Sequence, residues 1–241
     1  GEEIQDEYEL NVRLNKDVCP VCSKVNSGYY ETVVQLRSQA KLLNEEKIAE
    51  VEKIINKTMV KLKEKDKLAY IPQRAEIKEG VDYYIGSLKS GRKLAIAIQN
   101  EFGGVIKESP RLISQDKSTG KGIYRVWISI RLPEFNKGDF IEFKDKIAKV
   151  LDFNGNKIIA IDLDTLESFD INWKESTNIK LLKTSSESIP TTVTSKSPNT
   201  LQILDPESYE VVDFPMNENY QKYSIGDEIK TISINNRLYI I

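Results

Sequence analysis

The clearest pattern in the chain is a strict alternation of apolar and polar residues that ends at Leu132. One face of this segment would carry Tyr124, Val126, Ile128, Ile130 and Leu132, and the other would carry Arg125, Trp127, Ser129 and Arg131. Successive side chains of a strand point to opposite faces, so this alternation predicts a strand that is buried on one side only. A polar stretch with Gly120 and Gly122 comes before the strand, and both glycines can serve a tight turn.

The same reading extends over the first 133 residues. Alternation predicts further strands at 7–14, 30–36 and 81–85, and a hairpin that joins 105–114 to 123–132. Apolar residues at three- and four-residue spacing predict a helix capped by Asn44, with the stripe Ile48, Val51, Ile54, Ile55, Met59 and Leu62. A second helix would begin at Ser87 or Ser90 and stop at Gly103-Gly104. Residues 1–133 therefore predict an α+β domain, a mainly antiparallel sheet with two helices on one face.

After Pro133 the pattern changes to short strands separated by turns. Strands are predicted at 139–143, 146–153, 157–163 and 168–173, with Asn154-Gly155 as a hairpin turn between the second and the third. This spacing predicts a small β-barrel over residues 134–176. Residues 184–198 are rich in Ser and Thr and are interpreted as a flexible loop, inside a second small β-barrel that spans 177–241. Residues 185–241 hold four basic and eight acidic residues, so this part is acidic.

Composition sets the class of protein. The chain has 241 residues, of which 39% are hydrophobic and 30% charged, as in ordinary globular proteins with two or three domains. No apolar run approaches the about 20 residues that a membrane helix needs, and no signal peptide is visible. With only two cysteines, we expect a cytoplasmic protein without disulfide bonds. Separately, we expect a monomer. The chain begins Gly-Glu-Glu without Met, and we expect that further native sequence precedes it.

The candidate chemistry argues against an enzyme. Histidine is absent, which removes catalysis by Ser-His and Cys-His pairs and metal sites built on His. The glycines match no phosphate-binding loop. The neighbouring carboxylates Asp162 and Asp164, and Asp205 and Glu207, fall at turns, where such residues usually shape the backbone.

Cys19 and Cys22 form a Cys-x-x-Cys pair with two possible chemistries. A redox dithiol is expected to stand at the start of a helix, whereas here Pro20 and a polar turn lead into the predicted strand. Two thiolates on a tight turn fit half of a zinc site better, although structural zinc takes four ligands. Inert cysteines are the third alternative.

Residues 86–131 form a basic segment in an otherwise slightly acidic chain. They contain nine Lys and Arg against Glu101, Glu108 and Asp116, a local charge of +6 in a chain of net charge −2. A local basic surface predicts a polyanionic partner, and Trp127 between arginines suits base stacking. Alternatively, Trp127 packs beneath a helix or a neighbouring domain, and the charges are a solvated face. The candidate rRNA-binding residues are Lys89, Arg92, Lys93, Arg111, Lys117, Lys121, Arg125, Trp127 and Arg131.

Several motifs carry a resemblance to a known family. The Cys-x-x-Cys pair is followed by Val-Val-Gln-Leu-Arg at 33–37, Glu-Ile-Lys-Glu-Gly-Val-Asp-Tyr-Tyr at 76–84 and Arg-Leu-Ile-Ser-Gln-Asp at 111–116. In this order they resemble the ribosomal large-subunit export adaptor family, the "nonsense-mediated decay protein three" family, in an archaeal form truncated at its N-terminus. The resemblance runs from about Tyr8 to Trp173 and is weak after residue 177.

The resemblance implies a fold and a function. It implies a zinc-binding N-terminal part, then a Src-homology-three-like barrel, then an OB-fold. It also implies docking on the intersubunit face of the large ribosomal subunit, across the tRNA sites towards the exit site. Zinc would bind Cys19 and Cys22 together with an earlier Cys-x-x-Cys pair that this chain lacks, so the half-site can be empty. We therefore expect a non-enzymatic ribosome-binding factor of large-subunit biogenesis or quality control. The alternative is a protein-docking module with little rRNA contact.

Overall fold

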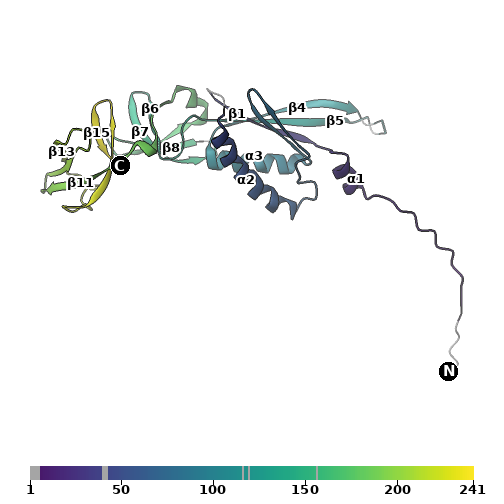
Figure 1. The fold of residues 1–241 in the computed structure, drawn as a ribbon. Helices are drawn as coiled ribbons and strands as arrows, with labels where there is room; N and C mark the ends of the chain where they lie inside the picture. Colours follow the sequence, from purple (N-terminus) through teal and green to yellow (C-terminus); the bar gives the residue numbers. More distant parts are fainter. Residues whose placement is uncertain (1–5, 40–42, 116, 119, 156) are drawn as a thin grey trace.

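The computed structural model describes residues 6–39, 43–115, 117–118, 120–155 and 157–241. Over these residues the chain forms three five-stranded sheets, which follow one another along an elongated molecule (Figure 1). Two helices, α2 (Glu45–Lys63) and α3 (Leu88–Phe102), pack against the first sheet. This arrangement confirms the predicted order of an α+β unit followed by β-rich parts.

The first sheet has the strand order β2 (Gln73–Ile77), β3 (Gly80–Ile85), β1 (Thr32–Ser38), β5 (Gly122–Leu132) and β4 (Val105–Gln115). The central pair, β1 and β5, is parallel, and the other neighbours are antiparallel. Both helices lie on the same side of this sheet (Figure 1). The predicted mainly antiparallel sheet with helices on one face is confirmed.

Capping residues define both helices. The Asn44 side chain accepts a hydrogen bond from the Lys47 N–H at 2.9 Å and begins α2, whose Val51, Ile55 and Met59 are buried against the sheet. Ser87 caps α3 in the same way. Gly103 ends α3 with φ +73°, a left-handed conformation that glycine adopts without strain.

Three details of the first part differ from the sequence analysis. Residues 7–14 are exposed and without secondary structure rather than a strand, because no neighbouring strand in the described chain supplies hydrogen bonds to them. Residues 20–26, interpreted as a turn, form the short helix α1 (Pro20–Asn26). Strand β2, which was not predicted, pairs with β3 at the sheet edge, where its mostly exposed side chains leave no apolar alternation to detect.

The second sheet contains the four predicted short strands and a fifth. Its order is β10 (Lys180–Lys183), β6 (Phe140–Phe143), β7 (Lys146–Asn154), β8 (Lys157–Asp162) and β9 (Ser168–Asn172). The β7–β8 hairpin pairs Asn154 with Lys157, as Asn154-Gly155 predicted. A short 3-10 helix, η1 (Trp173–Asn178), carries the chain to β10.

The third sheet corrects the expectation of a flexible loop at 184–198. A 3-10 turn, η2 (Ser185–Glu187), is followed there by the eight-residue strand β11 (Ile189–Lys196). Alternation in β11 rests on Thr191 and Val193, which are buried, and a Ser/Thr-rich strand of this kind is easily mistaken for a loop. The first half of β11 pairs with β14 (Glu228–Ile234) and the second half with β12 (Thr200–Leu204). The outer strands are β13 (Val211–Pro215) and β15 (Arg237–Ile240).

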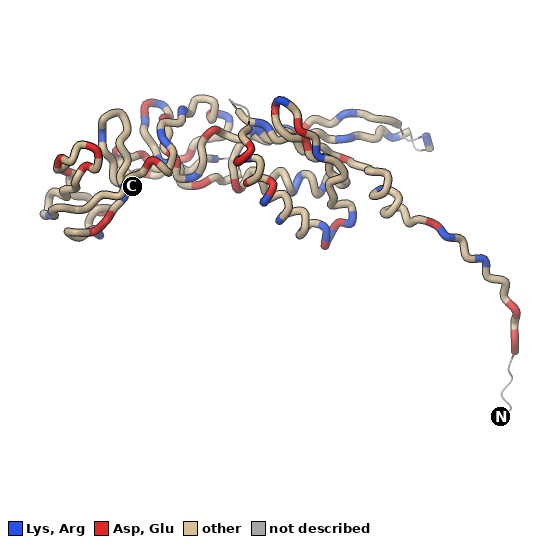
Figure 2. Tube along the Cα trace, viewed as in Figure 1, with Lys and Arg blue, Asp and Glu red and all other residues tan. Residues whose placement is uncertain are grey.

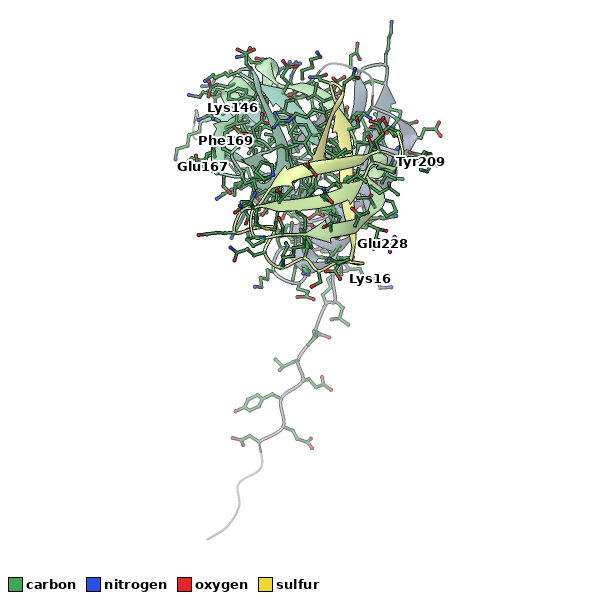
Figure 3. The ribbon with its side chains drawn as sticks, turned by 90° about the vertical axis from the view of Figure 1, so that its left-hand side faces the viewer. Lys16, Lys146, Glu167, Phe169, Tyr209 and Glu228 are labelled. Carbon is green, nitrogen blue, oxygen red and sulfur yellow. The ribbon has the colours of Figure 1, made fainter. Side chains whose placement is uncertain are left out.

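Each sheet packs against the next through apolar side chains. Between the first and the second, a Cβ atom on Gly103 would lie only 2.3 Å from the Trp173 ring, so α3 ends directly on that indole. Between the second and the third, Phe140 and Leu163 form one buried cluster with Ile232, Ile234 and Tyr239. Viewed from the end that carries the third sheet, Lys146 and Phe169 of the second sheet lie side by side, with the ammonium 5.2 Å from the ring centre (Figure 3).

Candidate nucleic-acid interface

The first sheet has one face covered by helices and one face that no helix of the described residues covers. Val126, Ile128, Ile130 and Leu132 of β5 are buried on the helix side. Trp127 lies on the opposite side of the strand and is half-buried, so it does not pack beneath a helix. We call this second side the open face and define it by the paired positions of its strands. It carries Val33, Gln35, Arg37, Asp82, Tyr84, Val105, Lys107, Ser109, Arg111, Arg125, Trp127, Ser129 and Arg131.

Two arginine–aromatic stacks occupy the open face. Arg111 on β4 places its guanidinium carbon 4.7 Å from the centre of the Trp127 ring. Arg125 on β5 lies 3.9 Å from the centre of the Tyr30 ring, and its Nε donates a hydrogen bond to the Tyr30 carbonyl at 3.1 Å. The register makes this possible, because Arg111 pairs with Arg125 and Ser109 with Trp127, which brings the two stacks next to each other. Stacked guanidinium groups are held in place with donors directed outwards.

A third aromatic ring extends this row. Tyr84 of β3 meets Tyr30 edge to face, with ring centres 4.8 Å apart. Neighbouring on the same face, Asp82 accepts a hydrogen bond from Arg37, whose charge it neutralises, and a second one from Gln35 at 3.2 Å. Asp82 is therefore the acidic group among the open-face residues, and its charge is already matched. The face presents aromatic surface and positive charge, the combination that binds nucleotides by stacking and phosphate contact.

The nine predicted residues fall into three places. Arg111, Arg125, Trp127 and Arg131 lie together on the open face. Lys117 and Lys121 lie where β4 and β5 join, at the far end of the hairpin (Figure 2). Lys89, Arg92 and Lys93 are exposed on α3, on the helix side of the sheet. The nine residues therefore do not form one continuous surface.

Arg92 in particular is engaged within the protein. Its guanidinium makes a two-pronged ion pair with Glu108 of β4, with N–O distances of 2.9 and 2.8 Å. The hydrogen bond to Glu108 raises the pKa of Arg92, which stays charged. This pair ties α3 to the edge strand, so Arg92 is a weaker candidate for phosphate contact than the open-face arginines.

Sequence reasoning missed Tyr30, Tyr84 and Lys107 as members of the face. Lys107 could have been found, because it shares its parity along β4 with Arg111. Tyr84 could have been found too, because it alternates with the buried Val81, Tyr83 and Ile85. The alternation of 30–36 predicts Tyr30 on the face of Val34 and Leu36, which is wrong: Tyr30 precedes β1 and lies against Arg125 and Tyr84 of the open face.

The cysteine pair stands apart from this face, at the start of α1. Cys19 caps the helix, and its sulfur accepts a hydrogen bond from the Cys22 N–H at 3.2 Å. Bonds from the Cys22 thiol and N–H lower the pKa of Cys19, while the bond to Cys19 raises the pKa of Cys22. The pair thus stands at a helix start, where a redox dithiol is expected, and the prediction that a turn follows it is wrong; Pro20 is compatible with this start because the first turn needs no N–H there. The described residues contain no group of three or more potential metal ligands, so the pair supplies at most half of a tetrahedral site.

The residues that match a known protein family are those of the first sheet and its helices. A family model described as "NMD3, second domain" aligns from just before β1 to the end of β5. Residues 29–132 match the NMD3 second domain. The NMD3 match therefore covers the open face, both helices and the hairpin, and excludes the two β-rich parts that follow.

Two further comparisons add little to the NMD3 match. No curated protein matches the chain at a significant level. A solved structure of "eukaryotic translation initiation factor 5A from Methanococcus jannaschii" shares 16% identity over 44% of this chain and 88% of its own, with a TM-score of 0.29. A score this low supports no conclusion about the fold.

In the described part of the chain, no helix is long and apolar enough to cross a membrane.

Proposed function

We propose that this protein is a non-enzymatic factor of large ribosomal subunit biogenesis or quality control, which binds the subunit through rRNA contacts of its first sheet. The match of residues 29–132 to the NMD3 second domain supports the class of function, because the NMD3 family serves large-subunit biogenesis and export. The observation that carries the rRNA contact is the open face, where two arginine–aromatic stacks stand beside each other without a covering helix.

In this proposal the phosphate-binding cations are those of the open face and the hairpin end. Six cations qualify: Lys107, Arg111, Lys117, Lys121, Arg125 and Arg131. Neutralising about six phosphates gives a slope of roughly −4 to −5 when log K is plotted against log salt concentration. Trp127 and Tyr30 would contribute stacking, which depends little on salt.

The finer docking position is also part of the proposal. The protein would lie on the intersubunit face across the tRNA sites, with the second and third sheets acting as Src-homology-three-like and OB-fold-like barrels near the exit site. Zinc would be held by Cys19 and Cys22 together with two ligands from outside the described residues. We place the protein in the cytoplasm as a monomer.

Co-sedimentation with purified archaeal ribosomal subunits tests the proposal. Selective, salt-sensitive binding to large subunits is expected, and reversal of charge at Arg111, Lys117 and Lys121 should abolish it. Reversal at Lys53, Lys57 and Lys61 is the matched control, because these exposed residues of α2 change the net charge equally on the helix side. Equal loss in both variants, or equal binding to small subunits, would contradict specific recognition by this face.

A protein-docking function is the second candidate, favoured by the acidity of residues 185–241. An acidic surface repels rRNA and attracts basic proteins. Binding to large subunits that falls less steeply with salt and survives the Arg111, Lys117 and Lys121 reversal would support this candidate instead.

A further inference from the structure

The β4–β5 hairpin reaches beyond the part of the sheet that the helices cover (Figure 1). Buried residues of β5 begin at Val126, and the described residues 107–115, 117–118 and 120–124 are all exposed. Water-exposed hairpin ends usually carry polar side chains. This one carries large apolar residues, with exposed fractions of 60% for Leu112, 47% for Ile113, 47% for Ile123 and 58% for Tyr124.

Two of these apolar residues, Leu112 and Tyr124, lie together and form what we call the hairpin patch. Leu112 and Tyr124 pair across the strands, and both close over Gly122. A Cβ atom on Gly122 would lie 2.8 Å from Leu112 Cδ1 and 2.9 Å from Tyr124 Cε2. The missing side chain of Gly122 therefore lets the leucine and the tyrosine come together, next to the register shift between Leu112 and Ser114.

Positive charge lies next to the hairpin patch. Lys117 and Lys121 follow it at the end of the hairpin, and Arg111 and Arg125 lie on the opposite side of the same two strands, against Asp116 alone between residues 109 and 125. A partner that fits this end must bring negative charge together with flat apolar surface. RNA with unpaired bases offers both, since its phosphates are anionic and its base faces stack on aromatic and apolar side chains.

We propose that the hairpin patch binds unpaired nucleotides of RNA, with a base stacked on Tyr124 and held against Leu112 while Lys117 and Lys121 contact the flanking phosphates. The inference rests on the proposed function, because it names the kind of RNA that the first sheet contacts. It assigns a separate task to the hairpin patch: the open face supplies charge along the strands, and the patch selects single-stranded over paired nucleotides.

The test compares two fluorescein-labelled RNAs of equal length, a stem with a seven-nucleotide loop and a fully paired duplex, by anisotropy with the whole chain. Changing Leu112→Ser and Tyr124→Ser together should weaken binding to the stem–loop by about 5- to 150-fold, the value of one lost stacking contact. Binding to the duplex should change less than twofold. The slope against salt should stay the same, because no charge is removed.

Two controls separate stacking from general damage. Tyr124→Phe keeps an aromatic ring and should bind the stem–loop like the unaltered protein. Ile96→Ser on α3 removes an equally exposed apolar residue, 51% exposed, from the helix side and should have no effect. Equal weakening for both RNAs, an effect of Ile96→Ser as large as that of the double change, or no weakening at all would overturn the inference.

Failure of the proposed function gives a different result. If the protein does not co-sediment with large subunits, yet binds the stem–loop in a manner that depends on Leu112 and Tyr124, the ribosomal proposal falls and the patch remains. If it co-sediments normally while the double change alters neither RNA binding nor co-sedimentation, only the inference about the patch is wrong.

Discussion

Replacing Gly103 by alanine tests how tightly the first sheet is joined to the second. Gly103 has φ +73°, and a non-glycine residue in this left-handed conformation costs about 1–2 kcal/mol. In addition, the new Cβ would lie 2.3 Å from Trp173 Cη2, 2.6 Å from Cζ2 and 3.2 Å from a carbon of Phe153. These rings belong to a buried cluster and cannot swing into solvent, so overpacking adds about 1–3 kcal/mol. We expect a total loss of about 2–5 kcal/mol in the free energy of unfolding.

The assay is urea unfolding followed by tryptophan fluorescence in a Trp127→Phe background, where the buried Trp173 is the reporter. Gly226→Ala is the matched control, because Gly226 has φ +89° and no atom within 4 Å of its added Cβ. It should lose only the backbone part, about 1–2 kcal/mol. If the two variants lose the same stability, the contact between Gly103 and Trp173 contributes nothing and the prediction is wrong.

Three further predictions concern the first sheet. Gly91→Ala should destabilise the protein by about 1–3 kcal/mol although alanine favours helices, because the new Cβ would lie 2.2 Å from Thr32 Cγ2. The additional change Thr32→Ser removes that methyl group and should restore most of the lost stability in the same urea assay. Asp82→Ala should cost about 3–5 kcal/mol by leaving the largely buried Arg37 without its partner, whereas Glu76→Ala, which removes an exposed partner of Arg74, should cost less than about 1 kcal/mol. Burial acts to raise the pKa of Asp66, but hydrogen bonds from Ser90, Ser87 and the Leu68 N–H prevail and lower it. The charged Asp66 therefore stabilises the folded protein, and Asp66→Asn should be less stable than the unaltered protein above about pH 5. This difference should shrink as pH falls below about 3.9, because Asp66 then becomes protonated. A pH-independent difference between the Asp66 variant and the unaltered protein would contradict the last of these.

Prediction from the sequence succeeded where one periodicity dominates. The stripe of α2 and the alternation of β5 each correspond to a buried face, and Asn44 and Ser87 cap the two helices as predicted. It failed where alternation exists without a partner, as at 7–14, and where a partner exists without apolar alternation, as in β2 and β11. Pairing is a property of the neighbour, so the strand's own residues do not reveal it.

The candidate site shows the same limit. Charge counting along residues 86–131 found the basic segment, but it could not divide it between the open face, the hairpin end and α3. That division depends on which side of the sheet α3 lies. The stacks of Arg111 on Trp127 and of Arg125 on Tyr30 join residues up to 95 positions apart, and only the assembled sheet shows them.

The parallel pairing of β1 with β5 has a consequence for synthesis on the ribosome. The buried hydroxyl of Thr32 donates a hydrogen bond to the carbonyl of Val126, 94 residues later. The centre of the sheet therefore stays open until β5 has left the exit tunnel. Until then, β1 and its buried Val33, Val34 and Leu36 lack one neighbour, while α2, β2 and β3 can already form their local contacts. Contacts of such long range slow folding and leave an unpaired strand edge exposed in the meantime. During its synthesis, the nascent chain thus exposes the edge of β1 that faces β5 until the residues up to Leu132 have emerged.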